Sequence, residues 1–171
     1  VATIIHKDIY NKKHTEIEQF DGTSMILKME TKAGNLNIIN NHAPQAGHNS
    51  STKDAHYKQL TTMLRSFPRT DINIVVGDFN ARIIGKSGYE GVLGDYYLKN
   101  EHNTIENASN QVKENRIKFL DFCVENDMVV ANSLFNKPSE KQITHRATTC
   151  IDFKPPWDQE GYNSIDHILR N

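Results

Sequence analysis

Alternation of apolar and polar positions marks the front of the chain as β-rich. The opening segment Val1–His6 has the composition of a strand. Two alternating stretches, Met25–Met29 and Leu36–Ile39, flank a turn at Ala33–Asn35, and this pattern predicts a β-hairpin.

Apolar residues then recur at helical spacing. Tyr57, Leu60, Leu64 and Phe67 mark one face of a helix. Ser51 or Thr52 is expected to cap that helix, and Pro68 to end it. A second amphipathic helix is predicted further along, from three spaced apolar residues, Ile117, Leu120 and Val124.

The remaining pattern predicts short strands. Ile72–Val76 is β-branched and largely apolar, which is typical of a strand buried on both faces. Gly85–Glu114 is polar and without a clear period before the second helix, so it is interpreted as a surface excursion. Three further strands are predicted at Met128–Ala131, Ile143–Ala147 and Ile165–Leu169. Alternating strands and helices behind a hairpin indicate a layered α/β fold.

Composition narrows the class. A chain of 171 residues, 37% hydrophobic and 24% charged, fits one domain over residues 1–171. Cys123 and Cys150 are too few for a disulfide framework and are expected to be buried, which favours a reducing compartment. Without an apolar run of membrane length or a secretion signal, the chain is expected inside the cell, away from membranes. The net charge of −1 argues against a broad positive field for nucleic acid.

The tetrapeptide Gly77–Asn80 is the first candidate for chemistry, because it follows a predicted buried strand. In an extended chain Asp78 and Asn80 point to one side while Phe79 turns into the core. A carboxylate can take a proton from water, and an adjacent amide can orient that water. The alternative is an Asx-rich turn that only caps the strand.

The last predicted strand holds the second candidate. Asp166 and His167 are adjacent, so on a regular strand they face opposite sides of the sheet. Asp166 can orient an imidazole supplied from elsewhere in the chain, as a buried carboxylate holds a catalytic histidine in a productive tautomer. The alternative is an ordinary solvent-facing acid on a strand.

Four strings carry a resemblance to a known family, and they are Asn40–Gln45, Val76–Arg82, Leu120–Cys123 and Ile165–Leu169. In order and approximate spacing they resemble the endonuclease domains of non-LTR (LINE-type) retrotransposons, within the endonuclease/exonuclease/phosphatase superfamily. The resemblance implies a four-layered α/β sandwich. It also implies Mg²⁺- or Mn²⁺-assisted nicking of DNA in the nucleus, leaving a 3′-hydroxyl that primes a reverse transcriptase carried on the same polyprotein.

The resemblance also implies roles for single residues. Asp78 would activate the attacking water and act as a secondary metal ligand, with Asn80 helping to place the water. Asp166 would support a catalytic histidine. His42 stands where the family usually has a tyrosine, and it can still contact phosphate, although its proton is labile near neutral pH.

Candidate nucleic-acid contacts lie close to these motifs. They are Arg82, Lys86, Thr144 and Arg146. A basic side chain can meet a phosphate as a point charge or a fork, and the alternative for each single one is an ordinary surface charge.

Some family motifs have no counterpart among these residues. The metal-holding glutamate, an active-site asparagine and the terminal Ser-Asp-His motif are expected outside the sequence, so His167 is not the catalytic histidine. We therefore expect a single partial domain, incomplete at both ends and inactive or nearly so by itself.

Two other interpretations stay open. One is a degenerate or domesticated, non-catalytic fragment that at most binds nucleic acid or a protein partner. The other is a sugar- or lipid-phosphate phosphatase of the same superfamily, which the retrotransposon-like Ala43–Pro44 and Ala81–Arg82 make less favoured.

Overall fold

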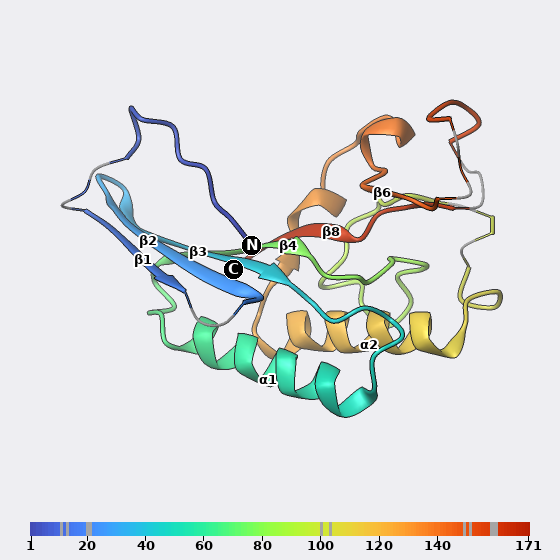
Figure 1. Ribbon diagram of the computed structural model, residues 1–171, viewed down its shortest axis with the longest axis horizontal. Coiled ribbons are helices and arrows are strands. Elements are labelled where there is room, and N and C mark those ends of the chain that lie inside the picture. Colours follow the sequence, from blue (N-terminus) through green and yellow to red (C-terminus); the bar gives the residue numbers. More distant parts are fainter. Residues whose placement is uncertain are drawn as a thin grey trace.

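The protein is built around one six-stranded sheet with two helices packed against one of its faces (Figure 1). The structure is a computed structural model that describes residues 1–10, 12, 14–19, 22–99, 101–102, 104–148, 150, 152–157 and 161–171. The strands of the large sheet are β1 (Thr15–Gln19), β2 (Ser24–Thr31), β3 (Gly34–His42), β4 (Ile72–Asp78), β5 (Val129–Val130) and β8 (Asp166–Arg170). They lie in the order β1-β2-β3-β4-β8-β5. Outside this sheet are the helices α1 (Ser50–Arg65) and α2 (Asn110–Glu125), the 3₁₀ turns η1 (Ala131–Ser133) and η2 (Ser139–Lys141), and the two-stranded pair β6 (His145–Arg146) and β7 (Tyr162–Asn163).

The predicted hairpin is confirmed as β2 and β3. Its register pairs Ile26 with Ile39, and the turn closes at Gly34, whose φ of 121° is a conformation that favours glycine. Strand β1, which pairs with β2, was not predicted. The strand predicted at Val1–His6 is wrong, since these residues form no strand.

Helix α1 is confirmed, but its predicted cap is wrong. The cap is Asn49, whose side chain accepts a hydrogen bond from the Thr52 N–H at 2.8 Å. The helix ends at Arg65, and Pro68 follows after a short turn.

Helix α2 begins earlier than its apolar residues suggested. Ser109 caps it, and its buried side includes Phe119, Leu120 and Cys123. Ile117 and Val124, predicted to lie on the buried face, are 45% and 52% exposed. The buried stripe was hidden in the sequence because the second turn of α2 carries two buried polar residues, Asn115 and Arg116.

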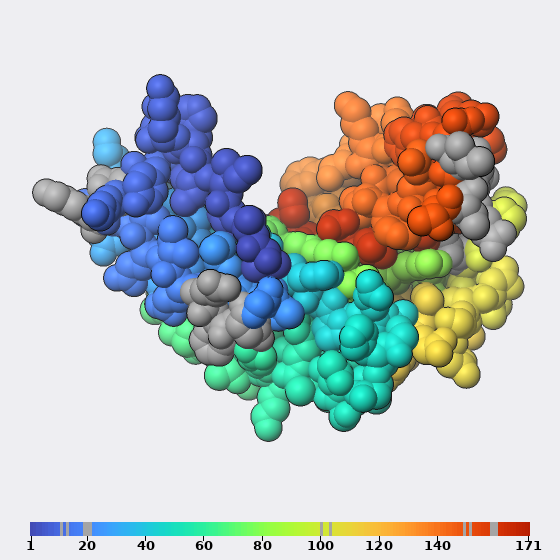
Figure 2. Space-filling view, viewed as in Figure 1, coloured from blue at the N-terminus to red at the C-terminus, as the bar shows by residue number. Residues whose placement is uncertain are grey.

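The core lies between the large sheet and the helices. Ile39, Val75 and Leu169 from the centre of the sheet are fully buried on this side, facing Leu60 and Phe119. The prediction that β4 is buried on both faces is wrong, because Ile72 is 47% exposed and Ile74 half-buried on the other face. That open face, with Ile168 also 47% exposed, forms the floor of a hollow between the N-terminal segments and the chain around β6 (Figure 2).

The later predictions hold in outline. Strands β5 and β6 lie inside their predicted segments but are shorter, β8 is shifted by one residue from its predicted segment, and β7 was not predicted. The predicted surface excursion Gly85–Glu114 is confirmed only in part. Its described residues before Ser109 form no helix or extended strand, but Asn110–Glu114 belong to α2. Val92 and Leu93 are buried, and Leu93 bridges to Val130. Cys123 is buried, whereas Cys150 is only half-buried.

These elements confirm the α/β class. No helix among the described residues is long and apolar enough to cross a membrane.

Candidate active site

Three neighbouring strands bring three candidate residues into one row. His42 at the end of β3 is the Cα partner of Asp78 at the end of β4, and Asp78 is the partner of Asp166 at the start of β8. Partners in register on adjacent strands point to the same face of a sheet. The imidazole and the two carboxylates therefore share the open face, and the His42 Nε2 lies 3.9 Å from the Asp78 Oδ2.

Gly77 explains how β3 and β4 approach so closely at this row. A Cβ atom at this position would lie 1.9 Å from the Asn41 carbonyl oxygen, and the residue has a φ of 135°. The next residue but one, Phe79, is fully buried with its ring 4.9 Å from that of Phe119. Gly77 and Phe79 thus anchor the strand end, and Asp78 between them faces outward.

Asn80 closes the motif with a turn. Its φ of 48° is left-handed, a region that asparagine tolerates better than most residues. Its backbone N–H donates to the Asp78 Oδ1 at 2.7 Å, and its side-chain Nδ2 donates to the Ala43 carbonyl at 2.7 Å. The Asx turn that the sequence allowed is therefore present, together with an outward-facing Asp78 carboxylate.

Asn115 of α2 supports this turn, and sequence reasoning missed it. Its Nδ2 donates to the Asn80 carbonyl at 3.0 Å and to the Pro44 carbonyl at 3.3 Å, and the residue is buried. One side chain thus ties helix α2 to the loops after β3 and β4. The only signal in the sequence was a polar residue at a buried helical position.

Burial raises the pKa of the Asp78 carboxyl above its usual range. The N–H of Asn80 opposes this shift, the neighbouring Asp166 charge adds to it, and His42 and His145 lower the pKa in part. His145, from β6, is thereby a further neighbour of the site that the sequence did not assign to it. Within the described part of the chain, neither Asp78 nor Asp166 forms an ion pair with a lysine or arginine.

This pair of carboxylates fits one kind of cation. Mg²⁺ is usually held by one or two carboxylates, with water and substrate phosphate completing its shell. Asp78 and Asp166 are adjacent and partly buried, and in the described structure neither pairs with a lysine or arginine, so they offer such oxygens. No cluster of three or more histidine, cysteine or acidic side chains suited to a metal occurs among the residues described.

His167 lies on the other side of the sheet. It is 2% exposed, and its ring stacks on Phe119 at 4.9 Å. Because the Ala81 carbonyl can only accept, the Nε2 donates to it at 2.8 Å, and the Nδ1 accepts from the Asn132 Nδ2 at 3.4 Å. Burial lowers the pKa of His167 to about 4. As predicted for a regular strand, Asp166 and His167 face opposite ways.

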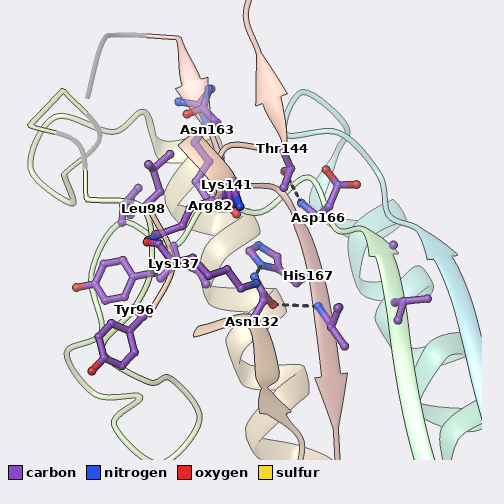
Figure 3. Close-up of a pocket in the computed structure, with 18 residues that line it drawn as sticks. Arg82, Tyr96, Leu98, Asn132, Lys137, Lys141, Thr144, Asn163, Asp166 and His167 are labelled. Atoms are coloured by element: carbon purple, nitrogen blue, oxygen red, sulfur yellow. Dashed lines mark hydrogen bonds between the residues drawn. The ribbon is translucent and has the colours of Figure 1, made fainter. Parts of the chain in front are cut away.

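A cavity of about 340 Å³ lies beside Asp166 (Figure 3). Two predicted nucleic-acid contacts line it, Arg82 and Thr144, and the Thr144 Oγ1 accepts the backbone N–H of Asp166 at 3.1 Å. Lys86 and Arg146 do not line it. Lys86 forms an ion pair with Asp95 at 2.6 Å, and Arg146 lies in β6.

The cavity also holds basic residues that the sequence did not single out. Lys137 and Lys141 contribute to its lining from the segment around η2. Nothing in the sequence near them forms a motif, so only the fold brings them to Asp166.

The fold resembles that of proteins of the endonuclease/exonuclease/phosphatase type. An AP endonuclease from Leishmania major shares the fold, with a TM-score of 0.51 and 13% sequence identity over 88% of this chain and 46% of that one. The endonuclease domain of TRAS1, a telomere-specific non-LTR retrotransposon, has a TM-score of 0.49 at 11% identity, over 91% of this chain and 53% of that one. An endonuclease/exonuclease/phosphatase family protein from Leptotrichia buccalis has a TM-score of 0.45 at 11% identity, over 86% of this chain and 42% of that one.

Curated relatives are distant. Craniofacial development protein 2 of Tragulus javanicus is 28% identical over 118 residues, and that of Bos taurus is 25% identical over 118 residues. Each match covers 69% of this chain but 18% of the relative. The chain therefore matches less than a fifth of those proteins. No family model matches it.

Proposed function

We propose that this chain contributes the Asp78 and Asp166 half of a metal-dependent active site that hydrolyses phosphodiester bonds in nucleic acid. The observation that carries the proposal is the direct pairing of these two carboxylates on the open face of the sheet, with no lysine or arginine partner in the described structure. Like charges placed side by side cost stability, so the arrangement favours a function that uses their negative charge.

Asp78 is the proposed acceptor of the proton from the attacking water. Its raised pKa makes its carboxylate a stronger base than an ordinary aspartate. The N–H of Asn80 occupies the Oδ1 and fixes the carboxylate, which leaves the Oδ2 toward His42 for the water. His42, more than half exposed, is placed to contact a phosphate oxygen as a hydrogen-bond donor.

Asp166 is the proposed neighbour that holds an imidazole in a productive tautomer. Thr144 fixes the backbone at this point, since its Oγ1 accepts the N–H of both Ile165 and Asp166. Asp78, beside Asp166, would hold Mg²⁺ or Mn²⁺ as a secondary ligand. When bound, the cation would neutralise charge on the phosphate.

A finer assignment rests on the four sequence motifs. We infer a DNA endonuclease of the LINE type, which leaves a 3′-hydroxyl for a reverse transcriptase of the same polyprotein and works in the nucleus. The 171 residues are inferred to be one partial domain whose own nicking is slow or undetectable. The likeness in fold to an AP endonuclease supports a substrate of the nucleic-acid class.

Binding of Mn²⁺ tests the site independently of turnover. Electron paramagnetic resonance titration with Mn²⁺ is expected to give about tenfold weaker binding for Asp78→Asn than for the unchanged chain. Glu101→Gln is the matched control, because it removes one exposed acid outside the row. Equal Mn²⁺ affinity for the unchanged chain and for both Asp78→Asn and Asp166→Asn would contradict the proposed metal site.

Nicking of supercoiled plasmid in Mg²⁺ tests the chemistry. Any nicking is expected to disappear in Asp78→Asn and Asp166→Asn, to persist in Glu101→Gln, and to leave ends that a DNA polymerase extends. Nicking that both site variants retain would overturn the proposal. Salt-sensitive DNA binding with neither Mn²⁺ binding nor nicking would support the non-catalytic interpretation instead.

A further inference from the structure

The cavity beside Asp166 exists because β8 has an open edge along its first half. Strand β5 pairs only with Leu169 and Arg170, so Asp166–Ile168 have no strand partner on that side in the described structure. Side chains there accept the backbone N–H groups that a neighbouring strand would otherwise bind. The Asn132 Oδ1 accepts the Ile168 N–H at 3.0 Å, and the Thr144 Oγ1 accepts the Asp166 N–H at 3.1 Å. The space of about 340 Å³ is bounded by this edge and by the chain around Tyr96 (Figure 3).

Positive charge is concentrated around this space. Arg82, Lys137 and Lys141 line it, and Asp166 is its one acidic lining residue. The whole chain carries a net charge of −1, so this local excess runs against the average. Burial lowers the pKa of Arg82, which means that an anion beside it would relieve an electrostatic cost.

The two lysines are available to a ligand. Within the described residues neither Lys137 nor Lys141 forms an ion pair, in contrast to Lys86, which is held by Asp95. Figure 3 shows both lysines with Arg82 around the same space, opposite Asp166. Lysine ammonium groups bind phosphate as mobile point charges.

Local hydrogen bonds fix the segment that carries these lysines. The Lys141 N–H donates to the Pro138 carbonyl at 2.9 Å, and the Gln142 Nε2 donates to the Lys137 carbonyl at 2.6 Å. The Gln142 Oε1 is buried and has no hydrogen-bond partner in the described structure, although the residue lines the cavity. With almost no accessible surface, this oxygen is closed to a ligand, so Gln142 holds the lysine segment through its Nε2 and does not itself contact the ligand.

The size of the cavity limits what can enter. About 340 Å³ is at the lower end of small-ligand pockets, enough for one nucleotide and far too little for a duplex. Tyr96, 43% exposed, lines the wall and offers an aromatic face of the kind on which sugars and bases pack.

We propose that this cavity is a subsite for one nucleotide of the substrate strand next to the bond that is cut. Its phosphate would lie on Lys137 and Lys141. The subsite rests on the proposed nuclease function, because it adjoins Asp166, and it adds Lys137 and Lys141 to the residues that hold the strand.

The test measures binding without hydrolysis. Binding of a labelled eight-nucleotide single-stranded DNA is measured by fluorescence anisotropy in EDTA, and every chain carries Asp78→Asn so that no DNA is cut. The double variant Lys137→Gln/Lys141→Gln is compared with the control Lys58→Gln/Lys113→Gln. Both variants remove two positive charges, but the control lysines lie on the helices and outside the cavity. The cavity variant is expected to bind about tenfold more weakly, and its salt slope to fall by roughly 1.4 for two lost phosphate contacts. The control is expected to change affinity less than about twofold.

Three results would overturn the subsite. They are an equal loss in both double variants, no loss in the cavity variant, and equal affinity for deoxyadenosine monophosphate and the eight-nucleotide strand, which would indicate a site for free nucleotides. Circular dichroism checks that each variant folds, and the single variants Lys137→Gln and Lys141→Gln, expected to lose about threefold each, replace the double one if it does not fold.

Failure of the subsite and failure of the proposed function are separable. If only the cavity variant loses DNA affinity and Asp78→Asn leaves Mn²⁺ binding unchanged, the subsite is supported and the proposed metal site is contradicted. If Asp78→Asn weakens Mn²⁺ binding and the cavity variant keeps its DNA affinity, the metal site is supported and the subsite is contradicted.

Discussion

Asp78 and Asp166 are direct partners in the antiparallel pairing of β4 and β8, so two carboxylates stand side by side on one face of the sheet. Like charges in directly opposed positions destabilise a sheet. The pairing of Asp78 with Asp166 is therefore expected to lower the stability of the fold while it concentrates negative charge, a combination that is common at functional sites.

Asp78→Asn is expected to stabilise the fold at neutral pH. The folded-state pKa of Asp78 is raised, first by burial, so the carboxyl favours folding below its unfolded-state pKa and this stability is lost as pH rises through the folded-state value. Asparagine keeps an oxygen for the Asn80 N–H and removes the charge. Urea unfolding is expected to give a gain of about 0.5–1 kcal/mol at pH 7 that vanishes near pH 3.

Asp95→Asn is the matched comparison for this prediction. The pKa of Asp95 is lowered, chiefly by its hydrogen bond with Lys86, so its replacement should not stabilise the chain. A gain in stability from Asp95→Asn as large as that from Asp78→Asn would mean that the effect reflects net charge and not the row.

Gly77→Ala is expected to be strongly destabilising. The added Cβ would meet the Asn41 carbonyl oxygen at 1.9 Å, and backbone on both strands would have to move. We expect a loss of about 3 kcal/mol or more in chemical unfolding, within the range of severe packing and backbone strain. Gly47→Ala is the control, since no atom lies within 4 Å of a Cβ built there. A loss below about 1 kcal/mol for Gly77→Ala would contradict this close approach.

Much of this arrangement follows from local sequence. Alternation and helical spacing located α1, the β2–β3 hairpin and β4, and the order of residues in Gly77–Asn80 and Ile165–Leu169 pointed to Asp78 and Asp166. These features depend on neighbours along one strand or helix. Burial of a helix face was less predictable, because Asn115 and Arg116 interrupt the apolar stripe of α2.

The cavity depends on contacts between distant segments. Arg82, Tyr96, Lys137 and Asp166 come from four separate parts of the chain, and none of them has a local pattern that indicates the others. Such convergence is visible only after the strand order and the loop paths are known.

Asn41→Leu is expected to stabilise the protein. Asn41 is 1% exposed, and neither its Oδ1 nor its Nδ2 has a hydrogen-bond partner in the described structure. An unsatisfied buried amide costs about 1–3 kcal/mol, and leucine has a similar size and branching without polar atoms. Thermal unfolding is expected to shift upward by several degrees. Asn73→Leu is the contrasting control and should destabilise, because the Asn73 Nδ2 donates to the Pro68 carbonyl and its Oδ1 accepts from Asn37.

His167 is expected to make the fold acid-sensitive below its ordinary titration range. Its pKa is lowered to about 4 in the folded state, mainly by burial, against 6.5 for a free histidine. A group with a depressed folded-state pKa contributes stability above its unfolded-state value and loses it as pH falls toward the folded-state one. Protonation would also put a hydrogen on the Nδ1, which faces the Asn132 Nδ2 donor at 3.4 Å. The unfolding free energy should fall by roughly 3 kcal/mol between pH 7 and pH 4 from this residue alone.

His167→Gln isolates that contribution, because glutamine keeps an N–H for the Ala81 carbonyl but does not titrate. The variant is expected to be less stable at pH 7, having lost the ring stacked on Phe119. Its disadvantage should shrink steadily as the pH is lowered toward 4, when unfolding by urea is followed in parallel for both chains. A stability difference that stays constant from pH 7 to pH 4 would mean that His167 is as easily protonated in the folded chain as in the unfolded chain. The conclusion that burial keeps the His167 imidazole neutral would then be wrong.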